Sequence, residues 1–278
     1  MAQFKLDGIA LVVGAAGGIG EEVAFTFAEA GVKGMLLADI NTDGANKAAE
    51  KTKSVASNAS FKCLTTGVDA TDADSVGNMV KLAVDTFGRI DYCINAIGVD
   101  VAEYVPFQNT SLEDYDRVLG ANTKGPFLIT RAVGDVMLSQ DPVKVNMGRH
   151  GTRDAGRGSI VHVSSAMSLC AVPAKAPYTT SKHALTGVMR AAAMDLKSAG
   201  IRVNQVCPTW VRTPMLEEEC RRLPQVPDII SRISPLKRAI EPDEVAAACL
   251  YLCSPSTVSV NGLTLTMDTG ILIGPIIG

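Results

Sequence analysis

The stretch VVGAAGGIGEEVAFTFAEAG at residues 12–31 decides the fold, because an apolar run ends in glycines and a helical pattern follows at once. Glycine lets the backbone turn tightly and approach a ligand closely. The N-terminus of the following helix offers free N–H groups and a positive dipole end to a pyrophosphate. Three glycines in a turn can also serve close packing only, so this reading needs support from elsewhere in the chain.

Asp39 gives that support. It ends a second apolar run nineteen residues after Gly20, where a carboxylate can accept hydrogen bonds from ribose hydroxyls. The glycine spacing is GxxxGxG, formed by Gly14, Gly18 and Gly20. Asp39 would repel a 2′-phosphate, and the next residues, Ile40 and Asn41, bring no positive charge. NAD is therefore predicted in preference to NADP.

Composition favours small-molecule chemistry. The chain has 278 residues, 47% of them hydrophobic, and a formal net charge of -3, which gives no basic footprint for nucleic acid or an anionic membrane. Its seven cysteines and three histidines lack metal-ligand spacing and are predicted to be reduced thiols and structural side chains. The apolar run after Lys5 resembles a signal segment, but Glu21 and Glu22 follow it directly. We expect an uncleaved, soluble, cytoplasmic protein without a membrane span.

Short apolar runs alternate with helical patterns, which predicts βαβ units and a single doubly wound α/β domain over residues 1–278. The expected fold is Rossmann-like, with a parallel seven-stranded sheet and helices on both faces. A stripe from Val76 to Phe87 predicts one helix that ends at Gly88. Residues 141–158 are predicted to be a long surface loop, with a basic phosphate site as the alternative. The seven strand candidates are IALVV (9–13), MLLA (35–38), FKCLTTGV (61–68), DYCIN (91–95), SIVHVS (159–164), IRVNQVC (201–207) and LTLTM (263–267).

The segment YTTSK places a phenol and an ammonium, Tyr178 and Lys182, one turn apart on one face of a predicted helix. Both lie on a stripe that continues through Leu185 and Met189, so Tyr178 could be only a core residue. A lysine on an inward stripe is costly without a partner, which argues against that alternative. A phenol of pKa about 10 is a poor proton carrier near neutrality, and a nearby ammonium is expected to lower that pKa.

The motifs together resemble the single-domain short-chain dehydrogenases/reductases over nearly the whole chain. Ser165 lies thirteen residues before Tyr178, the family's separation between catalytic serine and tyrosine, and is therefore chosen over Ser164. The resembling motifs, in family order, are GAAGGIG (14–20), Asp39, Asp69, NAIG (95–98), Asn122 in GANTKG, VHVSS, YTTSK and PTWVRT (208–213). The resemblance departs from the usual family pattern at Val13, at NAIG and at Pro208-Thr209, which puts details of cofactor packing in doubt.

The resemblance implies a role for each site residue. Tyr178 would be the general acid/base, Ser165 would bind the substrate oxygen, Lys182 would also hold the nicotinamide ribose, and Asn122 would fix a water that relays protons from Lys182. A hydride would pass between substrate carbon and nicotinamide. The cofactor-binding residues that this implies are Gly14, Gly17, Gly18, Ile19, Gly20, Asp39, Ile40, Asp69, Ala70, Asn95, Ala96, Gly98, Tyr178, Lys182, Pro208, Val211 and Thr213.

The predicted function is interconversion of a secondary alcohol and a ketone with NAD. A segment at about 209–240 is expected to cover a fairly apolar small molecule, and the chain resembles reductases of fungal secondary metabolism. The alternatives are a non-catalytic NAD-sensing protein and an enzyme similar to sugar-nucleotide epimerases. By the same resemblance we expect a homo-oligomer, a dimer or tetramer, paired through the helices that follow Ser111 and Ala176. The apolar tail 271–278 is expected to be buried in a partner.

Overall fold

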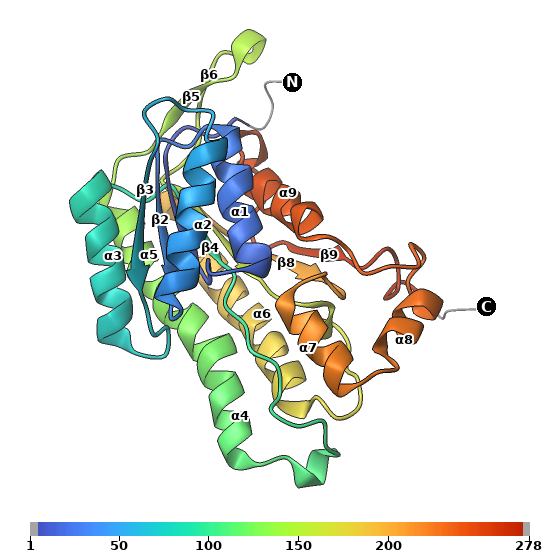
Figure 1. Ribbon diagram of the computed structural model, residues 1–278. Helices are drawn as coiled ribbons and strands as arrows, with labels where there is room; N and C mark the ends of the chain where they lie inside the picture. The colour runs from blue at the N-terminus through green and yellow to red at the C-terminus, as the bar shows by residue number, and fades with distance from the viewer. Residues whose placement is uncertain (1–4, 275–278) are drawn as a thin grey trace.

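The computed structural model describes residues 5–274, and all seven predicted strands form one parallel sheet (Figure 1). The strand order is β3-β2-β1-β4-β7-β8-β9, so the order reverses between β1 and β4. In an open α/β sheet, that reversal is where ligands bind, beyond the carboxyl ends of the strands. The strands are β1 (Ile9–Val13), β2 (Gly34–Asp39), β3 (Lys62–Gly67), β4 (Tyr92–Asn95), β7 (Gly158–Val163), β8 (Ile201–Pro208) and β9 (Thr264–Met267).

Helices cover both faces of the sheet, which confirms the predicted doubly wound fold. One buried cluster packs β1 and β4 against α1, α2 and α9, and a second packs the opposite face against α3, α5 and α6 (Figure 1). The central strands β1 and β8 are buried along their whole length, and β1 is accordingly apolar throughout. The helices are α1 (Gly18–Ala30), α2 (Thr42–Val55), α3 (Ala73–Phe87), α4 (Leu112–Leu119), α5 (Gly125–Ser139), α6 (Ala176–Leu196), α7 (Pro214–Arg222), α8 (Val226–Ile233) and α9 (Pro242–Cys253).

The helix predicted from the stripe between Val76 and Phe87 is α3. Its N-terminus is capped by Asp72, whose side chain accepts a hydrogen bond from the backbone N–H of Asp74. It ends at Gly88, which has a φ of 80° in the left-handed region. Local sequence signals therefore determine both ends of this helix.

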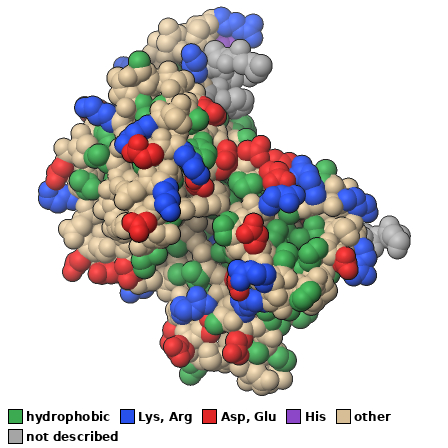
Figure 2. All heavy atoms as spheres, in the orientation of Figure 1, with side chains coloured by type: hydrophobic (Ala, Val, Ile, Leu, Met, Phe, Trp, Pro, Cys, Tyr) green, Lys and Arg blue, Asp and Glu red, His purple; other side chains and the backbone are tan. Residues whose placement is uncertain are grey.

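Residues 141–158, which were expected to be a long surface loop, contain regular secondary structure. They form a small antiparallel hairpin of β5 (Lys144–Asn146) and β6 (Thr152–Asp154), which projects from the body (Figure 1). Figure 2 shows basic and histidine side chains gathered at its tip. Each strand has three residues, all of them exposed or half-buried, so no apolar alternation marks them in the sequence.

Within residues 5–274, no helix combines the length and apolar character that crossing a membrane requires. The same residues contain no group of three or more His, Cys, Asp or Glu side chains that could hold a metal ion. All seven cysteines are free thiols, and five of them are buried. Burial raises the pKa of buried thiols such as Cys93, so these side chains act as small apolar core residues.

Candidate active site

The turn between β1 and α1 uses its glycines in two different ways. A Cβ at Gly20 would lie 2.0 Å from the carbonyl oxygen of Gly14, so Gly20 is required for close packing. Gly14 itself has a φ of +86°, a conformation that other residues rarely adopt. Gly17 has open space around it, with no atom within 4 Å of a Cβ placed there. Packing therefore explains Gly20 but not Gly17, which lines a groove.

That groove has a volume of about 580 Å³ and lies where β1, β2 and β4 end. Among the described residues that line it, none is Arg or Lys, whereas Asp39 and Asp69 contribute carboxylates. Asp39 is held by the backbone N–H groups of Ala16 and Asn41, each at 2.9 Å from one of its oxygens. The predicted cofactor residues that the groove brings together are Gly14, Gly17, Gly18, Ile19, Asp39, Ile40, Asp69, Ala70, Ala96, Gly98 and Thr213.

Asn95, another predicted cofactor residue, does not line the groove and is fully buried. Its Nδ2 lies 3.3 Å from His162 Nδ1, and its Oδ1 accepts from the N–H of Ile97. His162 Nε2 lies 3.2 Å from the hydroxyl of Thr130, which itself donates to a backbone carbonyl. Burial, and then the Lys182 ammonium, lower the pKa of His162 to about 4. The ring is therefore neutral, and its contacts with Asn95 and Thr130 hold the ends of β4 and β7 against α5.

A second cavity of about 310 Å³ adjoins the groove and shares Ile19, Thr213 and Met215 with it. Ser165, Tyr178, Pro208 and Val211 line this cavity, whereas the predicted cofactor residues Gly20 and Lys182 line neither the cavity nor the groove. Figure 2 shows hydrophobic side chains gathered among charged ones over α7 and α8, the helices beside it. Most of its wall is apolar, formed by Ile19, Met167, Val172, Trp210, Val211, Met215, Leu216, Ile233, Ile271 and Leu272.

The segment expected to cover the substrate contributes to this cavity through Trp210, Leu216 and Glu219, among others. Burial of the apolar tail in a partner stays a prediction. Ile271 and Leu272 line the cavity of their own chain, whereas Ile273 is 90% exposed. Residues 275–278 lie outside the described part of the chain.

Tyr178 and Lys182 lie on α6, as predicted, with Lys182 Nζ 5.5 Å from the centre of the Tyr178 ring. The Lys182 side chain is buried, and its ammonium donates to the carbonyl of Val163 at 3.4 Å. Burial lowers the pKa of Lys182 to about 8. A Cβ at Gly98 would lie 3.4 Å from Lys182 Nζ, so this glycine leaves room beside the ammonium. Tyr178 lines a cavity and is not merely a core residue.

The expected lowering of the Tyr178 pKa is not found. Burial raises the pKa of the phenol, and the Asp100 carboxylate raises it further. A hydrogen bond with Ser165 acts in the opposite direction and lowers it. The sequence expectation was wrong because spacing within a helix shows the neighbouring ammonium but neither the loss of water nor an acid from a distant loop.

The two adjacent serines differ in their partners. Ser164 Oγ lies 2.6 Å from Ser168 Oγ, so the two hydroxyls are paired with each other. Ser165 Oγ accepts from the N–H of Met167 at 3.1 Å and hydrogen-bonds the Tyr178 phenol. Its position beside the phenol favours Ser165 over Ser164 as the residue that meets a substrate oxygen.

Asn122 lies in a π-helical turn, Gly120–Lys124, between α4 and α5. Its Nδ2 donates to the Val99 carbonyl at 2.9 Å and to Ser181 Oγ at 3.1 Å, and its Oδ1 accepts from the Val99 N–H at 2.8 Å. The buried amide thus joins the segment after β4 to α6, one residue before Lys182. These contacts do not test the predicted water, which stays a prediction.

Sequence reasoning missed the four charged residues in the wall of the second cavity, which are Asp100, Lys175, Glu219 and Asp268. Lys175 lies three residues before Tyr178, at the N-cap of α6. It is therefore about one helical turn from Tyr178, as Lys182 is on the other side. Asp100 and Glu219 come from segments far away in the chain, and no local pattern links them. The segment 166–172 was also missed, because its contribution is scattered and apolar.

Comparison with known proteins agrees with this geometry. A family model described as "Enoyl-(Acyl carrier protein) reductase" matches residues 14–272. The chain is 37% identical over 267 residues to the short-chain dehydrogenase anuF of Penicillium roqueforti, covering 96% of each chain. It is 38% identical over 267 residues to the short-chain dehydrogenase fogB of Aspergillus ruber, covering 95% of this chain and 97% of that one.

Among solved structures, a 3-oxoacyl-[acyl-carrier protein] reductase from Brucella melitensis in complex with NAD superposes with a TM-score of 0.84. It is 25% identical and covers 98% of this chain and 100% of its own. The chain therefore belongs to the short-chain dehydrogenase/reductase family and is an oxidoreductase. The resemblance seen in the motifs is confirmed.

Proposed function

We propose that this enzyme interconverts a secondary alcohol and a ketone on a fairly apolar small molecule, with NAD as cofactor and Tyr178 as general acid/base. The observation that carries the proposal is the junction of two cavities. Ser165 and Tyr178 line one, the glycine turn and Asp39 line the other, and Ile19, Thr213 and Met215 line both. A substrate in the first cavity and a dinucleotide in the second would meet there.

The residues present fit a dinucleotide. Gly17 leaves open space at the N-terminus of α1, where backbone N–H groups suit a pyrophosphate, and Asp39 lies where a ribose would. NAD is favoured over NADP because the groove lining carries two carboxylates and, among the described residues, no Arg or Lys to pair with a 2′-phosphate. The Brucella relative whose structure contains NAD supports this choice. Bound NAD would supply the hydride acceptor.

Each side chain then has a distinct part in moving the proton. In reduction the Tyr178 hydroxyl donates its proton to the carbonyl oxygen and becomes a phenolate, and in oxidation the phenolate takes a proton from the alcohol. Ser165 donates a hydrogen bond to the same oxygen. Lys182 places a positive charge 5.5 Å from the ring, which stabilises the phenolate that reduction leaves behind. Asn122 positions the Val99 backbone and α6 around them.

The segment at about 209–240 is proposed to cover the substrate, because Trp210, Leu216 and Ile233 lie in the cavity wall. Two alternatives are weaker. A protein that only senses NAD has no use for a tyrosine and serine hydrogen-bonded beside a second cavity. An enzyme of the sugar-nucleotide epimerase type needs room for a polar nucleotide-sugar, and this cavity is lined mainly by apolar side chains.

The test is a steady-state assay of the purified protein with NADH and with NADPH across a panel of cyclic and aromatic ketones. We expect NADH oxidation that depends on the ketone, with a higher kcat/KM for NADH than for NADPH. NADH binding without turnover of any ketone would favour the sensing protein. Activity confined to nucleotide sugars would favour the epimerase-type enzyme.

A further inference from the structure

Three charged side chains from separate segments meet in the wall of the proposed substrate cavity. Lys175 Nζ lies 2.9 Å from Asp100 Oδ2 and 2.8 Å from Glu219 Oε1. The side chains of Lys175, Asp100 and Glu219 are only 7%, 11% and 12% exposed. The same ammonium lies 5.6 Å from the centre of the Tyr178 ring. This charged cluster therefore borders the reacting tyrosine on the side where a substrate would lie.

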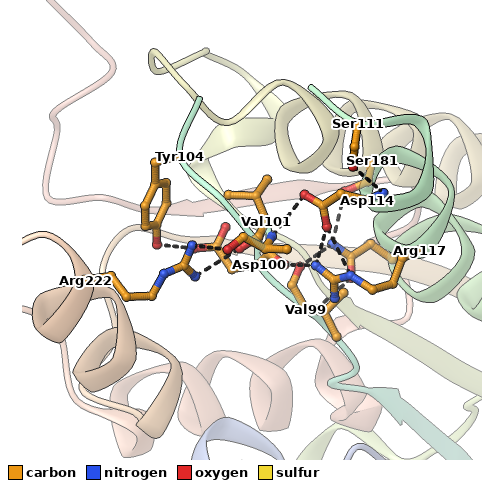
Figure 3. Close-up of polar contacts among 11 residues, drawn as sticks. Val99, Asp100, Val101, Tyr104, Ser111, Asp114, Arg117, Ser181 and Arg222 are labelled. Carbon is orange, nitrogen blue, oxygen red and sulfur yellow. Dashed lines mark hydrogen bonds and ion pairs between the residues drawn. The ribbon is translucent and has the colours of Figure 1, made fainter. Parts of the chain in front are cut away.

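The segment that carries Asp100 is firmly held, as Figure 3 shows. The hydroxyl of Tyr104 donates to Asp100 Oδ2 at 2.8 Å, and Arg117 donates to the Asp100 carbonyl at 2.7 Å. From α7, Arg222 donates to the Val101 carbonyl at 3.0 Å and stacks 4.3 Å from the centre of the Tyr104 ring. The Asp100 carboxylate therefore has a fixed position.

The cluster has more acceptors than donors. Asp100 Oδ1 is buried without a hydrogen-bond donor, and Glu219 pairs with Lys175 through Oε1. The fourth charged residue of the cavity, Asp268, differs, because both its oxygens accept from backbone N–H groups, those of Gly270 and Leu272. Leaving a buried carboxylate oxygen unpaired costs free energy, so a ligand that supplies a donor gains by filling the vacant position.

We propose that Asp100 and Glu219, with Lys175 between them, form a subsite that binds a second, neutral hydroxyl group of the substrate, so that the preferred substrate is a hydroxylated ketone or its diol. This rests on the proposed ketone and alcohol chemistry. The ammonium of Lys175 repels a cation, and the excess carboxylate repels a substrate carboxylate or phosphate. A neutral alcohol or phenol group both donates to a carboxylate and accepts from the ammonium, which matches all three residues.

The competing explanation is that the cluster only fastens α7 to the body, since Glu219 belongs to that helix. A fastening role predicts lower stability in variants and an equal loss of activity on every substrate. A binding role predicts a loss that depends on the substrate hydroxyl. The comparison of matched ketones separates the two.

The probes are cyclohexanone and its 2-, 3- and 4-hydroxy derivatives, assayed with NADH on wild type, Asp100→Asn, Glu219→Gln and the control Glu217→Gln. Glu217 is exposed on the same helix, and its variant makes the same charge change. A hydrogen bond to a charged group is worth about 1.5–3 kcal/mol, or roughly 10- to 100-fold. In wild type and Glu217→Gln, we expect kcat/KM for at least one hydroxylated ketone to exceed that for cyclohexanone by this factor, mainly through a lower KM.

Asp100→Asn and Glu219→Gln should lose most of the preference, measured within each variant as the ratio of kcat/KM for each hydroxylated ketone to kcat/KM for cyclohexanone. Equal kcat/KM for all four ketones in wild type would overturn the subsite but leave the proposed function standing. A loss shared equally by all four ketones in the variants, with a lowered Tm, would show fastening instead. If no ketone is turned over, the proposed function fails first and the subsite fails with it.

Discussion

Lys182 Nζ lies 5.5 Å from the centre of the Tyr178 ring, and Lys175 Nζ lies 5.6 Å from the same centre. The tyrosine is therefore bordered by two ammonium groups that differ in their partners. Lys175 is ion-paired to two carboxylates, whereas Lys182 contacts a backbone carbonyl and is almost completely buried. This difference makes the two lysines separable by experiment.

Tyr178→Phe keeps the ring but removes the proton that must move. We expect kcat to fall by at least about 10², the typical loss for general acid/base catalysis, while NAD affinity stays within a few fold. Tyr251→Phe on α9 is the control and should keep full activity. The measurement is kcat with any accepted ketone, beside a fluorescence titration with NADH. A Tyr178→Phe enzyme with wild-type kcat, chemistry being rate-limiting, would remove Tyr178 as the proton carrier.

The pH profile of alcohol oxidation should respond oppositely to two neighbours of Tyr178. Burial has the largest effect on the pKa of the Tyr178 phenol and raises it. Asp100 raises this pKa further, as do Glu219 and Cys207, whereas the hydrogen bond with Ser165 lowers it. Asp100→Asn should therefore shift the rising limb of kcat/KM to lower pH, and Ser165→Ala should shift it to higher pH with a lower kcat. The exposed Asp116→Asn should not shift it. Shifts of the same sign in both variants would contradict this assignment.

Lys182→Met should stabilise the fold while it abolishes activity. Burial lowers the Lys182 pKa from 10.5 to about 8, so below pH 8 the folded protein carries the full cost of a buried ammonium. At about 1.4 kcal/mol per pKa unit, that cost is at most about 3.5 kcal/mol. The advantage of the variant should shrink as pH rises from 8 to 10.5, because the folded lysine loses its proton first.

The measurement is urea unfolding of Lys182→Met and of the control Lys47→Met, which lies exposed on α2. Lys47→Met should change the unfolding free energy by less than about 0.5 kcal/mol. A Lys182→Met protein less stable than wild type at pH 7 would show that the ammonium has a stronger partner than the Val163 carbonyl.

Two glycine variants should separate cofactor binding from folding. Gly17→Ala adds a methyl group in open space, at an extended backbone conformation that alanine can adopt. We expect an unchanged Tm and NAD binding weakened by about tenfold or more, since the methyl occupies the pyrophosphate position. Gly20→Ala meets a carbonyl oxygen at 2.0 Å and should fail to fold normally. Unchanged NAD affinity in Gly17→Ala, measured by calorimetry, would place the dinucleotide elsewhere.

Oligomerisation should depend on the apolar hollow between α5 and α6. Phe127 and Leu138 line it with Val188, and these first two side chains are 49% and 48% exposed. We expect a species larger than the monomer in sedimentation, and a shift to smaller species in the Phe127→Glu, Leu138→Glu double variant. Val55→Glu on α2 is the control. A wild-type monomer at micromolar concentration would contradict the prediction.

The sequence predicted the sheet well because strands such as IALVV and MLLA are apolar on both faces and are bounded by Gly or Asp. It located Tyr178 and Ser165 through fixed spacings. The sequence did not predict the cluster of Asp100, Lys175 and Glu219. These residues are far apart in the chain, and only the folded structure brings them together. Sequence reasoning also gave the wrong direction for the Tyr178 pKa, since the burial that determines it is a property of the folded chain.

The π-helical turn at Gly120–Lys124 has a consequence for redesign of this enzyme. One extra residue in a helix of 3.6 residues per turn rotates everything beyond it by about 100°. Helical wheels for α4 and α5 must therefore be drawn with separate phases. Deleting Ala121 would restore one continuous α-helix, locally more regular, and would turn either α4 or Asn122 away from Val99 and Ser181. In this segment helical regularity and the contacts of Asn122 oppose each other, and a design protocol that rewards regular helices would remove those contacts.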